Sequence, residues 1–201
     1  MSRFIETIKC RNGRLYNIDY HNSRFNVTLK KNYNVNSKFN LAELIDIPEN
    51  YSNGLFKCRV LYSDQIHKIE FLPYKQRNIN SLKLVEDNKI EYSFKYADRE
   101  KLNFLFNQRE ECDDILIVKH GCITDSFYAN TVFFDGQKWW TPDTPLLSGT
   151  QRAFLIDSEK IFITRITVHD LKKYSYAGLI NAMLGLDEMP RIPISEINGI
   201  D

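Results

Sequence analysis

Cysteine is scarce in this sequence, and the cysteines present form no recognised pattern. There are four, with no C-x-x-C pair among them: Cys10, Cys58, Cys112 and Cys122. A structural zinc site needs clustered thiolate or imidazole ligands, and a disulfide framework needs closely spaced cysteines. The sequence therefore predicts reduced thiols, a cytoplasmic location and no metal site.

Long hydrophobic segments and charge of a single sign are also lacking. The N-terminus, MSRFIETIKCRNG, has no apolar segment like that of a secretory signal, and no run reaches the length that spans a membrane. The 27 Lys and Arg residues nearly balance the 26 Asp and Glu residues, for a net charge of +1, and no block carries one sign. We therefore expect a soluble intracellular protein, with neither nucleic acid nor a membrane as its partner.

Specific phosphate-binding and hydrolase motifs are missing as well. The sequence contains no G-x-x-x-x-G-K-[ST], no G-x-G-x-x-G and no G-x-S-x-G pattern. It has ample core material, because 43% of its 201 residues are hydrophobic and 13% are aromatic. Hairpin signals and helical stripes are mixed along the chain, which predicts an α+β fold. We expect a domain boundary near residues 79–88, between domains 1–85 and 86–201.

The most informative stretch is Asp113–Arg152. Two apolar runs predict strands, Asp135-Gly136 predicts a tight hairpin turn after the second, and a helix is expected to begin near Gln151. This pattern places polar side chains at strand ends and at a helix start: Asp125, Asn130 and Thr150. Polar groups in such positions can converge on a ligand that a rigid sheet holds.

The rest of the chain predicts further hairpins and helices. The N-terminal part predicts strands at Phe4–Cys10 and Leu15–Ile18 around an Asn12-Gly13 turn, then a helix over His21–Leu29. Residues 91–96 alternate between apolar and polar, which predicts a strand with Lys95 on its polar face. Asp98 is expected to cap a helix that runs to Glu111.

Several short motifs follow one another in the order typical of class IV aminotransferases, the pyridoxal-phosphate enzymes of fold type IV. They are Phe4-Ile5-Glu6-Thr7-Ile8, His21-x-x-Arg24, a lysine before an acidic helix, Ile123-Thr124-Asp125 with Ala129-Asn130, Gly149-Thr150-Gln151-Arg152 and Asn181-Ala182-Met183. The chain resembles this family. The resemblance implies an enzyme that binds pyridoxal 5'-phosphate and acts on small-molecule amines. The resemblance also implies a small N-terminal α/β domain, a larger C-terminal pseudo-barrel domain, and a homodimer whose subunits complete each other's pockets.

The resemblance assigns the catalytic lysine and its acidic partner. Lys95 matches the lysine that forms a Schiff base with the cofactor and moves protons at the substrate, whereas alternation alone favours a solvated strand lysine. Lys101 stays an alternative, because Lys101-Leu102-Asn103 partly matches a family pattern that has one more residue after its lysine. Asp125 stands where the family has a carboxylate, usually Glu, against the pyridine nitrogen. Its alternative role is an Asp that caps a turn between strands.

The resemblance also assigns a phosphate site. Arg24 matches the arginine that grips the cofactor phosphate, and the alternative is an exposed helix arginine. Thr150 and Gln151 would offer backbone N–H groups at a helix start, although Thr150 is also a plain N-cap candidate. Asn181 or Ala182 would close the cradle, and Asn130 is expected in the same cofactor site.

Two of the motifs are closest to the lyase branch of the family: Ala129-Asn130 and Asn181-Ala182-Met183. They imply a lyase that converts 4-amino-4-deoxychorismate to 4-aminobenzoate and pyruvate, a step of folate synthesis. A branched-chain or D-amino-acid transaminase is the alternative, and a non-catalytic cofactor-binding protein is the third possibility. The arginine that holds the substrate carboxylate has no clear counterpart, although Tyr74 and Arg77 are weighed for that contact against a surface position.

Overall fold

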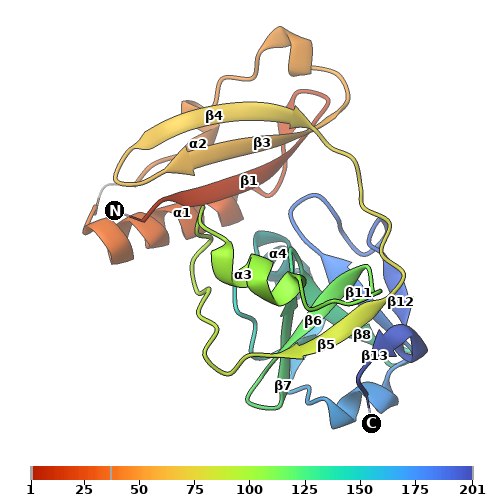
Figure 1. Ribbon diagram of the computed structural model, residues 1–201. Coiled ribbons are helices and arrows are strands. Elements are labelled where there is room, and N and C mark those ends of the chain that lie inside the picture. The colour runs from red at the N-terminus through yellow and green to blue at the C-terminus, as the bar shows by residue number, and fades with distance from the viewer. Residues whose placement is uncertain (1, 37, 201) are drawn as a thin grey trace. The chain divides into compact units, whose positions relative to one another are not determined.

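The computed structural model of this protein describes residues 2–36 and 38–200, and the chain forms two compact units (Figure 1). Unit 1 comprises Met1–Gln76 and Phe94–Asp98, and unit 2 comprises Arg77–Ser93 and Arg99–Asp201. This division differs from the expected boundary after residue 85. Strand β5 (Leu82–Glu86) pairs in parallel with β6 (Asp114–Lys119), and therefore it lies in unit 2.

Unit 1 is built on an antiparallel sheet with the strand order β2-β1-β3-β4. The strands are β1 (Phe4–Arg11), β2 (Arg14–Leu15), β3 (Leu55–Tyr62) and β4 (Ile66–Pro73). The hairpin predicted at Asn12-Gly13 is confirmed, and both turn residues have the positive φ (50° and 70°) that a two-residue turn of this type requires. The returning strand is shorter than predicted, because Ile18 already begins helix α1.

Helix α1 (Ile18–Tyr33) packs on β1 and contains the predicted helix over residues 21–29 (Figure 1). Its buried residues recur at helical spacing: His21, Phe25, Thr28 and Leu29. They meet every second residue of β1, since alternation turns Phe4, Ile8 and Cys10 to the same face. The short helices α2 (Leu41–Leu44) and η1 (Glu49–Tyr51) complete the unit.

The prediction of a strand over residues 91–96 is wrong, and the helix that follows is shorter than predicted. Only Tyr96 forms a β-bridge, opposite Phe4, and the Ile5 N–H donates to the Lys95 carbonyl at 2.9 Å. Strand β2 pairs with β1 only at its far end, so segment 94–98 covers the remaining edge near Phe4. Helix α3 spans Glu100–Phe106, and its N-cap is Arg99 rather than Asp98.

Unit 2 contains a mixed sheet in the order β10-β9-β8-β7-β6-β5-β13, with β11 and β12 attached to β8. Its remaining strands are β7 (Cys122–Ser126), β8 (Asn130–Phe134), β9 (Trp139–Pro142), β10 (Phe162–Thr164), β11 (Tyr176–Ile180), β12 (Arg191–Pro193) and β13 (Ile197–Asn198). The helices are α3, α4 (Thr150–Asp157), η2 (His169–Lys173) and η3 (Ile194–Glu196). This mixture of helices with parallel and antiparallel strands confirms the predicted α+β class.

Strand β8 is the centre of unit 2. It pairs with β7 at Asn130, with β9 at Phe133 and Phe134, and with β11 along its whole length. The core around it consists of aliphatic and aromatic side chains, among them Ile123, Phe133 and Leu179. Such dense packing holds the polar residues at the start of β8 in one position.

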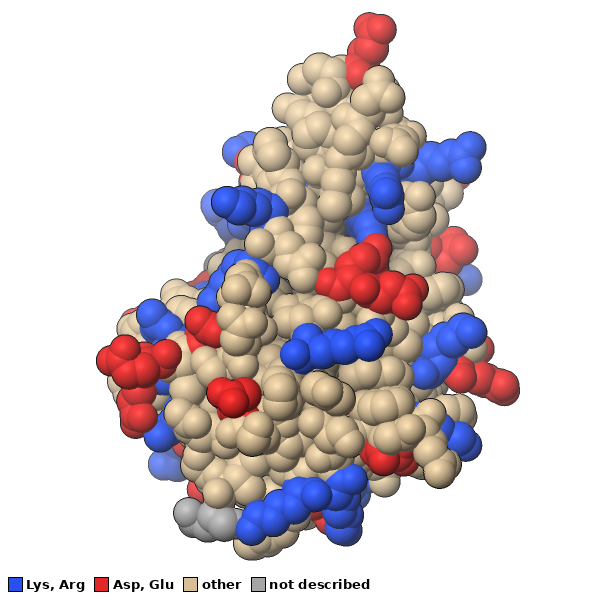
Figure 2. Space-filling model, turned by 90° about the vertical axis from the view of Figure 1, so that its right-hand side faces the viewer, with Lys and Arg blue, Asp and Glu red and all other residues tan. Residues whose placement is uncertain are grey.

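The surface carries both signs of charge. On the face that Figure 2 shows, Lys and Arg are interspersed with Asp and Glu, and neither sign forms a continuous patch there. Within residues 2–36 and 38–200, no helix has the length and apolar character needed to cross a membrane.

Candidate active site

A buried glutamate organises the predicted site residues of unit 1. Glu6 lies on β1 between Phe4 and Ile8, on the face that α1 covers, and its side chain is 0% exposed. Arg24 donates through Nε to Glu6 Oε1 (2.8 Å) and through Nη2 to Glu6 Oε2 (2.6 Å). His21, one turn earlier on α1, places Nδ1 2.5 Å from Glu6 Oε2. With its side chain 13% exposed, Arg24 is therefore not the exposed helix arginine of the alternative interpretation.

Glu6 is the anion of this cluster, and Arg24 is the cation that pairs with it. Burial raises the pKa of Glu6, but the charge of Arg24 and the hydrogen bonds from His21 and Arg24 outweigh burial and lower that pKa to about 2. Burial lowers the pKa of His21, and the charges of Arg24 and Lys95 lower it further, against the contact with Glu6. His21 is therefore neutral near pH 7, with its Nδ1–H donated to Glu6.

Lys95 belongs to the same unit as Arg24. The bridge between Tyr96 and Phe4 fixes its backbone beside β1, and its charge acts on His21. Its side chain is half-buried, whereas Lys101 is exposed on α3 in unit 2. The structure thus places both Arg24 and Lys95 where their charges act on His21.

A second buried carboxylate, Asp125, lies in unit 2. Asp125 lies within β7 opposite Asn130 of β8, and it is 6% exposed. Asn130 Nδ2 donates to Asp125 Oδ1 (2.8 Å), and the Leu147 N–H donates to Asp125 Oδ2 (3.0 Å). Asn130 Nδ2 also donates to the Leu147 carbonyl (2.9 Å), which ties the loop to both strands. Because Asp125 lies inside a strand, the interpretation of it as a turn cap is wrong.

Burial governs the ionisation of Asp125. It raises the pKa of this carboxyl to about 6, although the hydrogen bonds from Leu147 and Asn130 and the charge of Arg152 act in the opposite direction. A carboxyl group with such a pKa changes its protonation state readily when a charged group is placed beside it. Asp125 is therefore suited to pair with a buried cationic N–H group.

The start of helix α4 approaches Asn130 closely. A Cβ atom on Gly149, the N-cap, would lie 1.8 Å from Asn130 Oδ1, so only glycine fits at this position. Thr150 and Gln151 follow and are buried, and the first helical hydrogen bond runs from Ala153 N to the Gly149 carbonyl (2.9 Å). Thr150 is thus the first helical residue, not the N-cap. The positive end of the helix dipole lies next to Asn130, as an anion site requires.

Asn181 lies directly after strand β11, close to Asn130 and the start of α4. It follows Ile180, the residue of β11 that pairs with Asn130. Its Oδ1 accepts from the Met183 N–H (2.9 Å), and a β-bridge to Leu184 closes a turn. A Cβ on the next residue, Gly185, would lie 3.4 Å from Gln151 Nε2, so this turn adjoins the start of α4. All five predicted residues of unit 2 are therefore gathered around the start of β8.

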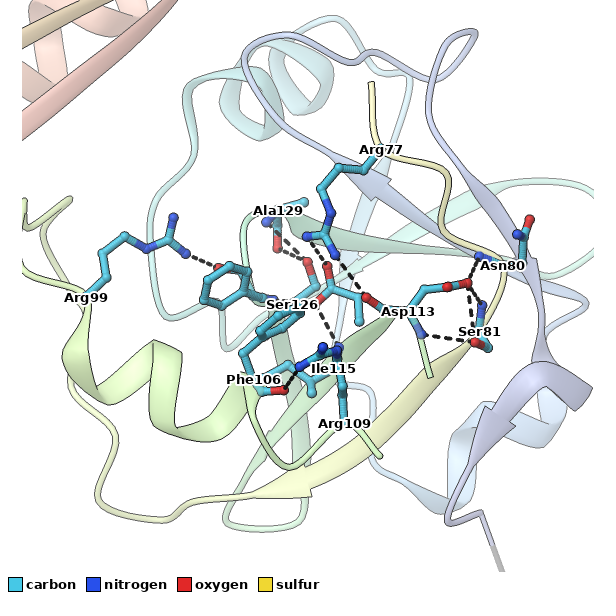
Figure 3. A network of polar contacts seen from close by, with 12 residues as sticks. Arg77, Asn80, Ser81, Arg99, Phe106, Arg109, Asp113, Ile115, Ser126 and Ala129 are labelled. Carbon is cyan, nitrogen blue, oxygen red and sulfur yellow. Dashed lines mark hydrogen bonds and ion pairs between the residues drawn. The ribbon is translucent and has the colours of Figure 1, made fainter. Parts of the chain in front are cut away.

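Arg77 takes part in a separate polar network of unit 2 (Figure 3). Its Nη2 donates to the Asp113 carbonyl (2.9 Å), and its Nη1 lies 3.4 Å from Asp114 Oδ2. Its guanidinium also lies over the rings of Phe106 (5.3 Å) and Tyr128 (5.2 Å). Burial raises the pKa of Asp114 to about 6. These partners give Arg77 a structural role in holding α3 and β6 together.

Glu6 is the site residue to which the sequence motifs assigned no role. A signal for it exists, because alternation along β1 places this acidic side chain in a row with Phe4, Ile8 and Cys10. A charge in such a row requires a buried partner. In the part of the chain that the structure describes, no group of three or more His, Cys, Asp or Glu could hold a metal ion.

Three known proteins are similar to this chain over most of its length. An "uncharacterized protein" of Haemophilus influenzae is 39% identical over 188 residues, which cover 92% of this chain and 100% of the relative. A "putative 4-amino-4-deoxychorismate lyase" of Haemophilus somnus is 38% identical, with a TM-score of 0.86 over 92% of this chain and 98% of the other. The PLP-bound form of a "hypothetical aminotransferase" of Mycobacterium tuberculosis is 15% identical, with a TM-score of 0.78 over 98% of this chain and 82% of the other, and so shares the fold.

The family comparison covers half of the chain. A model of the amino-transferase class IV family matches residues 93–193, which include Lys95 and all five predicted site residues of unit 2. The matching stretch and the relatives at 38% and 39% identity lead to one conclusion. The chain belongs to the amino-transferase class IV family of enzymes.

Proposed function

We propose that this protein is a pyridoxal-phosphate-dependent lyase that converts 4-amino-4-deoxychorismate to 4-aminobenzoate and pyruvate. The relative from Haemophilus somnus, which bears the name of this lyase, supports the reaction because it is 38% identical over nearly the whole chain. The observation that carries the proposal is the buried Asp125, held by Asn130 and Leu147 beside the start of α4.

The side chains and backbone of this protein fit pyridoxal 5'-phosphate. A dianionic phosphate needs guanidinium and backbone N–H donors, which Arg24 and the start of α4 supply. A protonated pyridine nitrogen needs a buried carboxylate, which Asp125 supplies. When bound, the cofactor supplies a ring that accepts electrons from the substrate. The similar fold of the PLP-bound aminotransferase from Mycobacterium tuberculosis supports the same assignment.

The residues of the chain then have distinct tasks. In unit 2, Thr150 and Gln151 would offer N–H groups to the phosphate, and Asn181 would close the cradle next to Gln151. In unit 1, Arg24 would supply a guanidinium for it. Asp125 holds a proton on the pyridine nitrogen, and Asn130 fixes the orientation of Asp125. Lys95 would hold the cofactor through its Nζ amine, which is the nucleophile of this site.

Lys95 also carries the proton that the lyase reaction moves. Its Nζ would take the proton from the ring carbon that bears the amino group, and the bond from the adjacent ring carbon to the ether oxygen would break as the ring becomes aromatic. The enolpyruvate leaves and accepts a proton on its methylene carbon, which gives pyruvate. The homodimer and the cytoplasmic location belong to the same proposal.

Product analysis tests the proposed reaction. Purified protein loaded with cofactor is incubated with 4-amino-4-deoxychorismate, and 4-aminobenzoate and pyruvate are quantified; we expect equal amounts of both. A transaminase, which the family name favours as the second candidate, would instead form glutamate from 2-oxoglutarate and an amino acid. If the protein binds the cofactor but forms neither set of products, it catalyses neither reaction, and this result overturns the proposal.

A further inference from the structure

The ion pair between Glu6 and Arg24 lies in the interior of unit 1, where an ion pair contributes little to the free energy of unfolding. Glu6 is 0% exposed and stands in an otherwise apolar row of β1. Removing two charges from water costs several kcal/mol, and apolar residues of similar volume often stabilise a protein as well or better. The pair therefore calls for an explanation other than stability.

The geometry of the pair offers one. Glu6 accepts from Nε and Nη2 of Arg24, which is a side-on contact that uses one edge of the planar guanidinium. Glu6 Oε2 is shared with His21 Nδ1, so the carboxylate itself cannot rotate without losing a second contact. The plane of the Arg24 guanidinium is thereby fixed, with its opposite edge turned away from Glu6.

We propose that Glu6 is a positioning residue, which orients Arg24 to bind the phosphate group of the cofactor and holds His21 as the neutral Nδ1–H tautomer. This inference rests on the proposed function, since the phosphate belongs to the proposed cofactor. A flexible arginine loses side-chain entropy when it binds an anion, and an arginine that a carboxylate already holds loses less. Glu6 thus adds affinity for the phosphate without contacting it.

The test compares binding of pyridoxal 5'-phosphate with binding of pyridoxal, which lacks the phosphate. Glu6→Gln keeps the shape of the side chain but replaces one acceptor by an NH2 donor, which faces a donor of Arg24 or His21. By fluorescence titration, we expect this variant to bind pyridoxal 5'-phosphate about 10- to 100-fold more weakly, with the affinity for pyridoxal nearly unchanged. The 31P resonance of the bound cofactor should shift relative to wild type.

Matched variants separate positioning from general damage. Glu70→Gln alters a more exposed contact between a glutamate and an arginine, Arg59, on neighbouring strands of the same unit, and it should leave both affinities unchanged. Glu6→Asp keeps the charge but shortens the reach, and it supplies the same comparison, with a smaller selective loss, if Glu6→Gln does not fold. In a double-mutant cycle with Arg24→Lys, the two losses of phosphate affinity should not add, because Glu6 acts through Arg24.

The outcomes distinguish the two proposals. If Glu6→Gln lowers the affinity for both ligands equally, or lowers only the melting temperature, Glu6 has a structural role. The inference is then wrong, while the proposed function stands. If wild-type protein binds neither ligand, the proposed function fails and the inference fails with it. A selective loss for the phosphorylated ligand supports the positioning role.

Discussion

Asn130 connects Asp125 to the loop before helix α4, because its Nδ2 donates both to Asp125 Oδ1 (2.8 Å) and to the Leu147 carbonyl (2.9 Å). A single amide thus links two strands and the start of a helix. The Asp125 carboxylate is oriented by this amide and by the Leu147 N–H, so its position is set before any ligand binds.

Replacing Asp125 by Ala should reduce turnover much more than cofactor binding. The phosphate contacts remain in this variant, but the pyridine nitrogen loses its partner, and we expect kcat to fall roughly 100-fold or more. Steady-state kinetics at saturating pyridoxal 5'-phosphate measures the effect. Asp143→Ala is the matched control, since it removes an Asp of the same unit that pairs with Arg165 on the surface. Unchanged turnover in Asp125→Ala removes this residue from the mechanism.

Borohydride reduction should identify Lys95 as the covalent attachment point. Reduction of the loaded enzyme converts a bond between lysine and cofactor into a stable one, which peptide mass spectrometry locates. We expect the label on the peptide that contains Lys95, none in Lys95→Ala, and full labelling in Lys101→Ala. Labelling at Lys101 would show that the lysine assignment is wrong.

Gly149→Ala should disturb the site through a steric clash. The new Cβ would lie 1.8 Å from Asn130 Oδ1, so Asn130 or the loop must move. We expect a loss of about 1 to 3 kcal/mol in the free energy of unfolding and weaker cofactor binding. Gly185→Ala is the control, because its Cβ would meet only flexible side-chain ends at 3.3 and 3.4 Å. Equal effects of the two substitutions in urea unfolding would contradict the clash.

Asp114 should make the protein less stable as the pH rises from about 4 to 7. Its pKa in the folded protein is about 6, above the ordinary value of 3.8, so folding favours the protonated form. The stability from this protonated form is present below the ordinary pKa and is lost as the pH rises through the folded pKa. A shift of this size corresponds to roughly 2 to 3 kcal/mol in the free energy of unfolding.

The variant Asp114→Asn isolates that contribution. The amide oxygen can still accept from the N–H groups of Ile115 and Phe127, which now bond the carboxylate, but the side chain no longer titrates. Urea unfolding at several pH values should show the variant gaining stability relative to wild type as the pH rises. A constant difference between the two proteins over this range would mean that Asp114 is not the titrating group.

The sequence by itself determined several local elements and the family of the protein. Alternation along β1, the Asn12-Gly13 turn and the helix over His21–Leu29 depend on residues close in the chain, and each was predicted correctly. The order of the motifs identified the family, which the matching relatives confirm. These features could be predicted because propensity, turn chemistry and side-chain periodicity act over a few residues.

Only the tertiary structure decided which segments pair. Strand β7 gave no alternating signal because nearly all its residues are buried, so Asp125 could not be placed inside a strand. Residues 91–96 do alternate, yet only Tyr96 finds a β-bridge, because a strand forms only where another offers a free edge. The pairing of Glu6 with Arg24 likewise joins residues 18 positions apart through the packing of α1 on β1. Long-range contacts of this kind follow from the packing of the whole chain, which local patterns do not encode.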